Sequence, residues 1–321
     1  MDAPLPTRGA PADELLEMVQ LLRRELARRR EAPRGDWVEE VANDLRAGRR
    51  TGWYYPLVQG GGLAFYSVFG AEAFGHVHVG QSDDAEERAA LLLSTLLAGL
   101  PADARSVDVG FTGLSGSAEG RMLGPFAGRP GATVIARELR EHPLVPADDA
   151  GPGPPPAGLL LVPVSDVTLE SLADLDVRAF AGTVDELLVG PRLEDHRRVI
   201  EAILDGSLGR FLPEASTALV APEPPRLLGA LLTGEQSPER AVFLNFLVDP
   251  AERGRGFGRY LLRWGLRALR ALGYSGVHLW VTVANVPARR LYEEHGFGVV
   301  NSATIYRWER SGAEAHPHSP R

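Results

Sequence analysis

The sequence has 321 residues and a formal net charge of −8, which argues against a general nucleic-acid-binding protein. It contains no cysteine, so disulfides and thiolate metal sites are excluded. Because no apolar run is long enough to span a bilayer and the first residues lack a signal-peptide core, we expect a cytoplasmic protein of two domains, without membrane or nucleic-acid partners.

The first half of the chain shows alternating helical and strand-like patterns after a loose tail at residues 1–11. Apolar side chains at helical spacing predict a helix over residues 12–30, and Asp36 is a suitable N-cap for a second helix. A third helix is predicted over residues 84–97. Strands are predicted over residues 53–59, 63–69, 74–79, 106–111 and 133–139. Three glycines, 60–62, separate the first two strands and favour a hairpin turn over a phosphate-binding loop.

Two histidines on one predicted strand raise the question of a metal site. His76 and His78 alternate, so both point to the same strand face. No third ligand is apparent nearby, so surface histidines are the favoured interpretation and no metal is predicted.

A stretch rich in proline and glycine, residues 144–158, divides the chain and predicts an extended linker. We therefore expect one domain over residues 12–143, a second over residues 159–311, and a flexible tail at 312–321. In the second domain, strands are predicted over residues 159–164, 217–221 and 227–233, and helices over residues 169–181 and 193–204.

The most informative stretch begins with an apolar strand from Phe243 that ends at the breaker Asp249-Pro250. A glycine-rich turn follows, Arg253-Gly-Arg-Gly-Phe-Gly258, and then a helical pattern. Glycines let backbone N–H groups approach a ligand closely, and a helix N-terminus carries about half a positive charge. This strand, turn and helix start together predict a binding site for an oxyanion such as a pyrophosphate.

A second strand and helix follow directly. Residues 277–282 read as a strand, and residues 285–296 as a helix with Asn285 as N-cap, Pro287 in the first turn and Gly296 at the left-handed C-terminal position. Tyr292 lies seven residues after Asn285, about two turns further along the same side.

The two halves of the chain also repeat each other. When residues 77–123 are shifted by 170 positions, their predicted elements coincide with those of the second half without a gap. The chemistry is not repeated, because Arg253, Gly256 and Gly258 fall on residues whose side chains suit a pyrophosphate poorly: Asp83, Glu86 and Arg88. We therefore expect the first copy to be degenerate.

These motifs resemble the GNAT superfamily of acyl-CoA-dependent N-acyltransferases. The pyrophosphate signature of that family, Arg/Gln-x-x-Gly-x-Gly/Ala, stands here as residues 253–258, and its second signature stands as Asn285, Ala288, Leu291-Tyr292 and Gly296-Phe297. The core resemblance covers about residues 160–310, and the repeat gives a tandem arrangement similar to mycothiol synthase. It implies an α/β (α+β) fold of two GNAT-like lobes, each a mixed, mostly antiparallel sheet flanked by helices.

The resemblance also implies roles for individual residues. Phe246, Leu247 and Val248 would bind the pantetheine arm of acetyl-CoA, with backbone groups of Phe246 and Val248 pairing as a pseudo-strand. The pyrophosphate would be held by backbone amides of Arg253, Gly254, Arg255, Gly256, Phe257 and Gly258. Asn285 would steady the pantetheine, and Tyr292 would protonate the departing thiolate. The pKa values of ~10 for tyrosine and ~8.5 for a thiol are close enough for that transfer to be useful.

The general base is less evident. An alkyl amine with a pKa near ~10.4 must lose a proton before it attacks. The strand positions where the family places a carboxylate hold Val242, Asn245 and Trp280. Asn245 would order a water that serves as base, Glu235, Glu239 or His278 would reach the site, or the substrate is a weakly basic amine that needs no base.

The sequence thus predicts an N-acetyltransferase that transfers an acetyl group directly from acetyl-CoA to a primary amine of a small molecule or peptide. We expect a monomer or weak dimer with one acetyl-CoA site per chain. The alternative is a catalytically weak pseudo-acetyltransferase that acts as an acyl-CoA-binding protein. A purely structural module does not account for the intact glycine turn.

Overall fold

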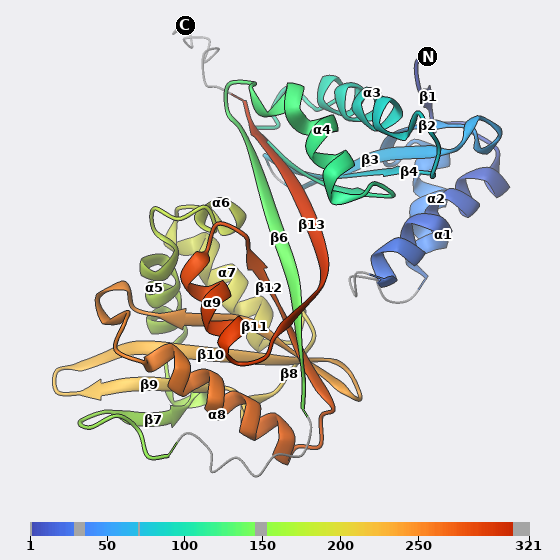
Figure 1. The fold of residues 1–321 in the computed structure, drawn as a ribbon. Coiled ribbons are helices and arrows are strands. Elements are labelled where there is room, and N and C mark those ends of the chain that lie inside the picture. Colours follow the sequence, from blue (N-terminus) through green and yellow to red (C-terminus); the bar gives the residue numbers. More distant parts are fainter. Residues whose placement is uncertain (1, 29–35, 70, 145–152, 311–321) are drawn as a thin grey trace, which may run out of the picture. The chain divides into compact units, whose positions relative to one another are not determined.

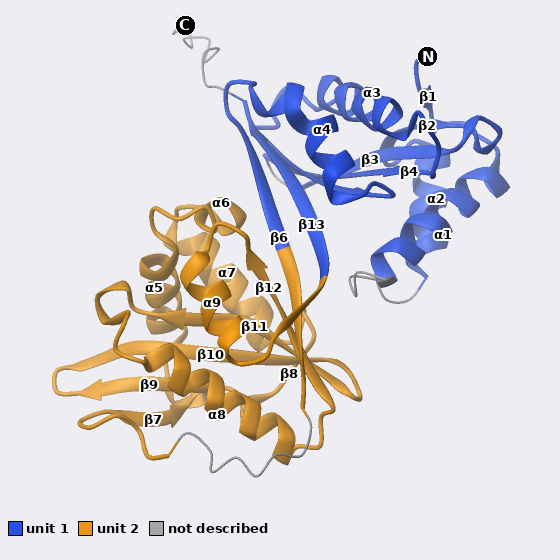
Figure 2. Ribbon diagram, viewed as in Figure 1, with its two compact units in different colours: residues 1–137, 301–321 blue, residues 138–300 orange. Residues whose placement is uncertain are grey.

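The computed structural model describes residues 2–28, 36–69, 71–144 and 153–310. The chain divides into two compact units, one of residues 1–137 with 301–321 and the other of residues 138–300 (Figure 2). Two long strands, β6 (Ala132–Pro143) and β13 (Gly298–Glu309), each begin in one unit and end in the other. This division differs from the predicted boundaries at residues 143 and 159, because residue periodicity does not show which sheet the end of a strand joins. Most of the predicted linker and the tail at 312–321 lie outside the described residues.

In the described residues of the first unit, four α-helices pack with a set of strands (Figure 1). The elements are β1 (Leu5–Pro6), α1 (Ala12–Arg28), α2 (Trp37–Ala47), β2 (Thr51–Tyr55), η1 (Leu57–Gln59), β3 (Gly62–Phe69), β4 (Glu72–Val79), α3 (Ala85–Ala98), β5 (Ser106–Thr112) and α4 (Gly116–Ala127). The strand order is β1-β2-β3-β4-β5-β13. The β4–β5 pair is parallel, whereas the pairs β1–β2, β2–β3, β3–β4 and β5–β13 are antiparallel. The hairpin at the three glycines is confirmed, because β2 and β3 pair antiparallel across it.

The prediction of a loose tail at residues 1–11 is wrong for its described part. Leu5 and Pro6 pair with Tyr54 and Trp53 of β2. Thr7 is buried, and its hydroxyl donates a hydrogen bond of 3.1 Å to the carbonyl of Gly52. A two-residue strand is too short to show any periodicity, so the sequence gives no sign that this segment is tied to the sheet.

The second unit contains the segment that the sequence singled out. Its elements are β7 (Leu160–Pro163), η2 (Val164–Asp166), α5 (Leu169–Phe180), α6 (Glu186–Val189), α7 (Leu193–Leu204), β8 (Arg210–Phe211), η3 (Pro213–Ala215), β9 (Thr217–Pro222), β10 (Pro225–Ser237), β11 (Arg240–Val248), η4 (Pro250–Glu252), α8 (Phe257–Ala271), β12 (Gly276–Thr282) and α9 (Val286–Glu294). The strand order is β6-β12-β11-β10-β9-β7, with β8 paired to β10. The mixed, largely antiparallel fold flanked by helices is confirmed.

Helices cover both faces of this second sheet, and strand alternation decides which residues they contact. On one face, α5 and α7 pack through Leu172 and Ile200 on side chains that include Leu247 of β11. On the other face, α8 packs through Leu262 on Leu231 of β10. Successive residues of β11 therefore contact opposite helical layers.

The two central parallel strands of the second unit separate along their length. β11 and β12 pair only from Arg240–Gly276 to Val242–His278, whereas β11 stays paired with β10 as far as Val248. Within the described ranges β11 and β12 form no later pair, so the end of β11 has an edge free for another extended chain. The corresponding strands of the first unit, β4 and β5, stay paired through seven residues to His78–Thr112.

The internal repeat is confirmed in the residues that cap two corresponding helices, α4 and α9. Ser115 accepts a hydrogen bond from the amide of Ala118 at the start of α4, and Asn285 accepts one from Ala288 at the start of α9. The two caps lie 170 positions apart, as the sequence shift requires.

Candidate active site

A turn with two left-handed glycines joins β11 to α8. Gly254 and Gly256 have φ angles of +80° and +84°, and a Cβ added to either would meet no atom within 4 Å. L-amino acids with side chains rarely adopt such angles, so glycine is required for the shape of the turn and not to relieve crowding. α8 begins at Phe257 with Gly256 as its N-cap, so the unpaired N–H groups of its first turn face the open space at the turn.

The side chain of Arg253 anchors this turn to the neighbouring helix. Its guanidinium donates a hydrogen bond of 2.8 Å to the carbonyl of Ala179, near the end of α5. Gly258 permits a close approach of α8 to α9, because a Cβ there would lie 3.3 Å from Leu291.

α9 contributes the two polar side chains that the sequence predicted on it. The side-chain carbonyl of Asn285 caps the helix at 3.2 Å from the amide of Ala288. Tyr292 is buried, with its ring 6.1 Å from that of Phe246 and 5.6 Å from that of Phe297. Burial, with a smaller contribution from the charge of Asp185, raises the pKa of Tyr292 well above its usual value, so the hydroxyl keeps its proton at neutral pH.

These elements enclose a cavity of about 890 Å³, within the range of small-molecule sites. Nine of the twelve predicted site residues line it: Phe246, Val248, Arg253, Gly254, Gly256, Phe257, Gly258, Asn285 and Tyr292. Residues 179–180 and 183–185, from the end of α5 and the loop after it, line the cavity as well. The structure therefore brings the two sequence signatures together around one space.

The other three predicted residues lie outside the cavity lining. Leu247 is fully buried in the cluster below α5 and α7, on the face of β11 away from Phe246. Arg255 points to solvent, pairs with Glu252 at 2.5 Å and stacks on the ring of Phe257.

Asn245, predicted to order a catalytic water, is also turned away from the cavity. It is buried, and its amide donates a hydrogen bond of 2.9 Å to Asp176 of α5. The catalytic role of Asn245 remains a prediction, and its contact with Asp176 does not favour it.

The residues considered as alternative bases lie elsewhere in the unit. Glu235, near the end of β10, pairs with Arg210 and accepts a hydrogen bond of 2.6 Å from Tyr274. Glu239 precedes β11, and His278 belongs to the part of β12 that is still paired with β11. The cavity opens beyond that paired part, which explains why none of these residues lines it.

Sequence reasoning missed Asp185, one of the carboxylates that line the cavity. Asp185 lines the cavity, accepts a hydrogen bond from the hydroxyl of Thr282, and lies 3.3 Å from the amide nitrogen of Asn285. It precedes α6 in a loop that carries no motif, so only its position in space identifies it.

His76 and His78 of the first unit contact other protein side chains. His78 is buried, contrary to the predicted surface position, and its Nδ1 lies 2.9 Å from the hydroxyl of Thr112. The ring of His76 packs on Phe65, and burial, assisted by the charge of Arg50, lowers the pKa of His76 to about 4. Among the described residues no group of three His, Asp or Glu is placed to hold a metal ion. Within that part of the chain, no helix is long and apolar enough to cross a membrane.

The place in the first unit that corresponds to the glycine turn is filled. Arg88, which the repeat aligns with Gly258, is buried, and its guanidinium bonds to the carbonyl of Gln59 and lies 3.1 Å from the carboxylate of Asp84. Glu86, expected to repel a pyrophosphate, is paired with Arg121. A buried arginine and fully paired strands, more than repulsion between acids, therefore distinguish this unit from the other.

Diverging parallel strands, a glycine turn at a helix start and an asparagine-capped helix with a buried tyrosine define the class of fold. Residues 181–297 match the model of the acetyltransferase (GNAT) family.

Parts of the chain are similar in sequence to known acetyltransferases. Over 81 residues the chain is 43% identical to the mycothiol acetyltransferase of Gordonia bronchialis, and over 138 residues it is 36% identical to that of Thermobispora bispora. These matches cover 25% and 43% of this chain, and 26% and 45% of the relatives. The chain thus spans less than half the length of the curated relatives it matches.

Two solved structures share the fold over almost the whole chain. A GCN5-related N-acetyltransferase from Sphaerobacter thermophilus superimposes with a TM-score of 0.60 at 16% identity, over 94% of each chain. A tandem GNAT protein from the clavulanic acid biosynthesis pathway gives a TM-score of 0.52 at 16% identity, over 96% of this chain and 97% of the other.

Proposed function

We propose that the second unit is an N-acetyltransferase that transfers an acetyl group from acetyl-CoA to a primary amine of a small molecule or peptide in the cytoplasm. The observation that carries the proposal is the cavity in which the glycine turn, the free edge of β11, Tyr292 and Asp185 meet.

The turn fits the diphosphate of acetyl-CoA. Gly254 and Gly256 leave open space over the backbone, and the first turn of α8 offers unpaired N–H groups and the positive end of its dipole. Arg253 and Arg259, which also line the cavity, add positive charge. A diphosphate is the ligand that such a cradle favours.

The free edge of β11 fits the pantetheine arm. Its backbone groups can extend the sheet as a short strand beside Phe246 and Val248, where β12 has moved away. The thioester would then lie near Tyr292 and the loop that carries Asp185.

In the proposed reaction, the bound ammonium first loses one proton to solvent. The free amine nitrogen then attacks the thioester carbonyl carbon, a C–N bond forms and the C–S bond breaks. The departing thiolate takes the proton of the Tyr292 hydroxyl, and the proton lost by the amine returns to the site through solvent. Because burial keeps the pKa of Tyr292 high, the hydroxyl is protonated before each turnover, and the thiolate beside it is the group that must be neutralised.

Asp185 is placed to bind the ammonium form of the acceptor. Its carboxylate lines the cavity, and the hydroxyl of Thr282 and the amide of Asn285 orient it. A cation is a favourable ligand for a partly desolvated carboxylate. This role would replace the strand carboxylate that the sequence lacks at Val242.

A panel of primary amines tests the proposal by release of free CoA thiol from acetyl-CoA. We expect amine-dependent release, and a loss of about 100-fold in kcat for Tyr292→Phe, the usual scale for a general acid. Binding of acetyl-CoA should change little, because the ring is kept.

One outcome would decide against the proposed function, and another only against the role of Tyr292. Slow thioester hydrolysis that is independent of every amine would favour the alternative, an acyl-CoA-binding pseudo-acetyltransferase. An unchanged rate in Tyr292→Phe would remove the tyrosine from the mechanism while leaving the transfer itself in place.

A further inference from the structure

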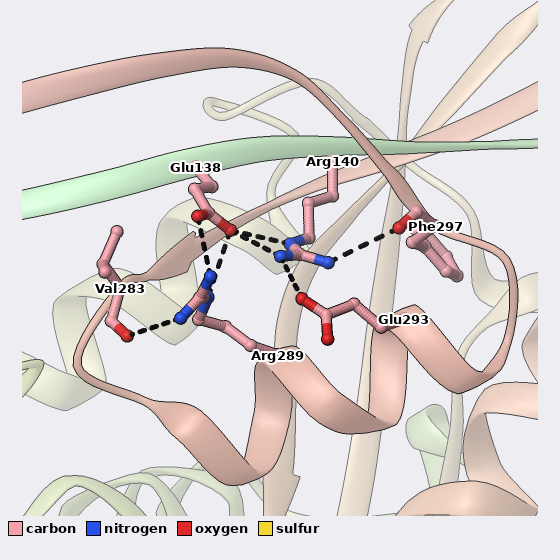
Figure 3. Close-up of polar contacts among 6 residues, drawn as sticks. All are labelled: Glu138, Arg140, Val283, Arg289, Glu293 and Phe297. Carbon is pink, nitrogen blue, oxygen red and sulfur yellow. Dashed lines mark hydrogen bonds and ion pairs between the residues drawn. The ribbon is translucent and has the colours of Figure 1, made fainter. Parts of the chain in front are cut away.

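α9 presents two different faces. Asn285, Ala288, Leu291 and Tyr292 line the cavity on one side. Arg289 and Glu293, one helical turn apart, do not line it and point toward β6 (Figure 3). The face away from the cavity thus has its own set of contacts.

Those contacts form one connected network of charges within the second unit. Glu138 of β6 accepts hydrogen bonds from Arg140 at 2.9 and 2.6 Å and from Arg289 at 3.2 and 3.0 Å. Arg140 also bonds to Glu293 at 2.7 Å and to the carbonyl of Phe297 at 3.4 Å (Figure 3). Glu138 and Arg140 of β6 therefore hold α9, and Arg140 also holds Phe297, which lies between α9 and β13.

The buried pair of Arg140 and Glu138 in this network differs from the surface ion pairs of the unit, although Glu293 is half exposed. The side chain of Arg140 is only 2% exposed and that of Glu138 15%, whereas Arg259 and Glu294, which pair between α8 and α9, are both more than half exposed. Exposed pairs contribute little and move freely, but a buried arginine needs all its partners. Burial alone would raise the pKa of Glu138, yet the bonds from Arg140 and Arg289 lower it, so the carboxylate is held in its charged form.

We propose that Glu138 and Arg140 are positioning residues that clamp α9 to β6 and so fix the Tyr292 hydroxyl and the Asn285 cap against the thioester. This inference rests on the proposed acetyl transfer. The forked guanidinium groups of Arg140 and Arg289 fix both the distance and the rotation of α9, which a single apolar contact would not do. Tyr292 directly precedes Glu293, so a rotation that frees Glu293 also moves the tyrosine ring.

The inference places part of the active-site framework in the first half of the sequence. Residues 138–143 precede the predicted linker, yet they belong to the second unit. A tyrosine displaced by about 1 Å is enough to lower a rate by as much as ~100-fold.

The test compares Arg140→Met with a matched control. Methionine keeps an apolar stem and removes the fork. In Arg140→Met we expect kcat for the amine substrate to fall about ten-fold or more, with a smaller change in KM for acetyl-CoA. Arg197→Met, which removes an arginine from an exposed pair with Glu201 on α7, should leave kcat within about two-fold of wild type. Arg140→Lys, which keeps the charge without the fork, should restore only part of the rate.

A double-mutant cycle separates positioning from a loss of stability. If the clamp acts through the tyrosine, adding Arg140→Met to Tyr292→Phe should change kcat by less than about two-fold, because the group being positioned is already absent. Losses that multiply in the double variant, or an unchanged kcat in Arg140→Met, would overturn the inference.

Hydrogen exchange gives a readout that needs no turnover. In Arg140→Met the amides of residues 286–294 should exchange faster while those of α8 stay at the wild-type rate. Unchanged exchange in α9 would overturn the clamp. A wild-type protein without amine-dependent thiol release would instead refute the proposed function, and the exchange comparison would still decide whether the clamp exists.

Discussion

The pair formed by Asp185 and Tyr292 concentrates the chemistry of the site in two residues. The tyrosine is a buried acid that keeps its proton, and the aspartate is a carboxylate held by Thr282 and Asn285. The charge of Asp185 adds to the effect of burial on the pKa of Tyr292, so the two residues are electrostatically coupled although their proposed roles differ.

Replacing Asp185 by Asn should therefore affect the amine and not the cofactor end of the cavity. We expect KM for the amine to rise about ten-fold from the loss of one charge-assisted contact, with KM for acetyl-CoA nearly unchanged. Initial rates measured against each substrate in turn provide the check. Asp174→Asn is the matched control, because Asp174 is exposed on α5 outside the cavity lining. Equal effects on both KM values would contradict the assignment.

The pH dependence of the same reaction has a definite sign. Since burial raises the pKa of Tyr292 above the ordinary value for tyrosine, its proton is not lost between about pH 6 and 9. For an alkyl amine with a pKa near ~10.4, the fraction present as the reactive free base rises about ten-fold for each pH unit over that range. The value of kcat/KM for the amine should thus rise steadily from about pH 6 to 9, and a maximum near pH ~7 would indicate a different acid.

At the scale of elements, a buried contact joins α5, α7 and β11 beneath the cavity. His196 of α7 lies 2.7 Å from Asp176 of α5, which also accepts the amide hydrogen bond of Asn245 in β11. All three side chains are buried. Burial lowers the pKa of His196, but the hydrogen bond and the charge of Asp176 outweigh it, so that the pKa ends above its usual value.

This raised pKa makes the stability of the helical layer depend on pH. A histidine whose pKa is raised in the folded state contributes stability that is complete below about pH 6.5 and is lost as the pH rises through its folded value. We expect the free energy of unfolding, measured in urea, to fall as the pH rises above about 6.5, by up to about 1.4 kcal/mol for every ten-fold gain in the proton affinity of His196 on folding. His196→Gln and Asp176→Asn should both flatten that slope. An unaltered slope in His196→Gln would show that another group is responsible.

The whole molecule shows which features a sequence encodes locally. α7 is found at the residues that the spacing of apolar side chains predicts, and Gly254 and Gly256 take the left-handed angles that only glycine adopts easily. Caps such as Asn285 are likewise determined by side chains within three residues.

Other features depend on residues that meet only after folding. The divergence of β11 from β12, the turn of Asp185 into the cavity and the buried Arg88 all arise from contacts between distant segments. The division of β6 and β13 between the two units is also non-local, because a residue pattern does not show which sheet the end of a strand joins. Sequence periodicity therefore predicted the elements well, and the framework around the candidate site only in part.

The difference between the two units predicts one acetyl-CoA site per chain. In the second unit the glycine turn is open and β11 has a free edge, whereas in the first unit Arg88 fills the corresponding place and β4 stays paired with β5. Calorimetric titration should give a stoichiometry of one. Gly256→Glu should abolish binding, because the side chain forces strain at a φ of +84° and its carboxylate repels a diphosphate. Gly120→Glu, at an open position of α4 without a left-handed angle, should bind as wild type does. A stoichiometry of two, or one site that survives in Gly256→Glu, would mean that the first unit binds the ligand despite its buried arginine.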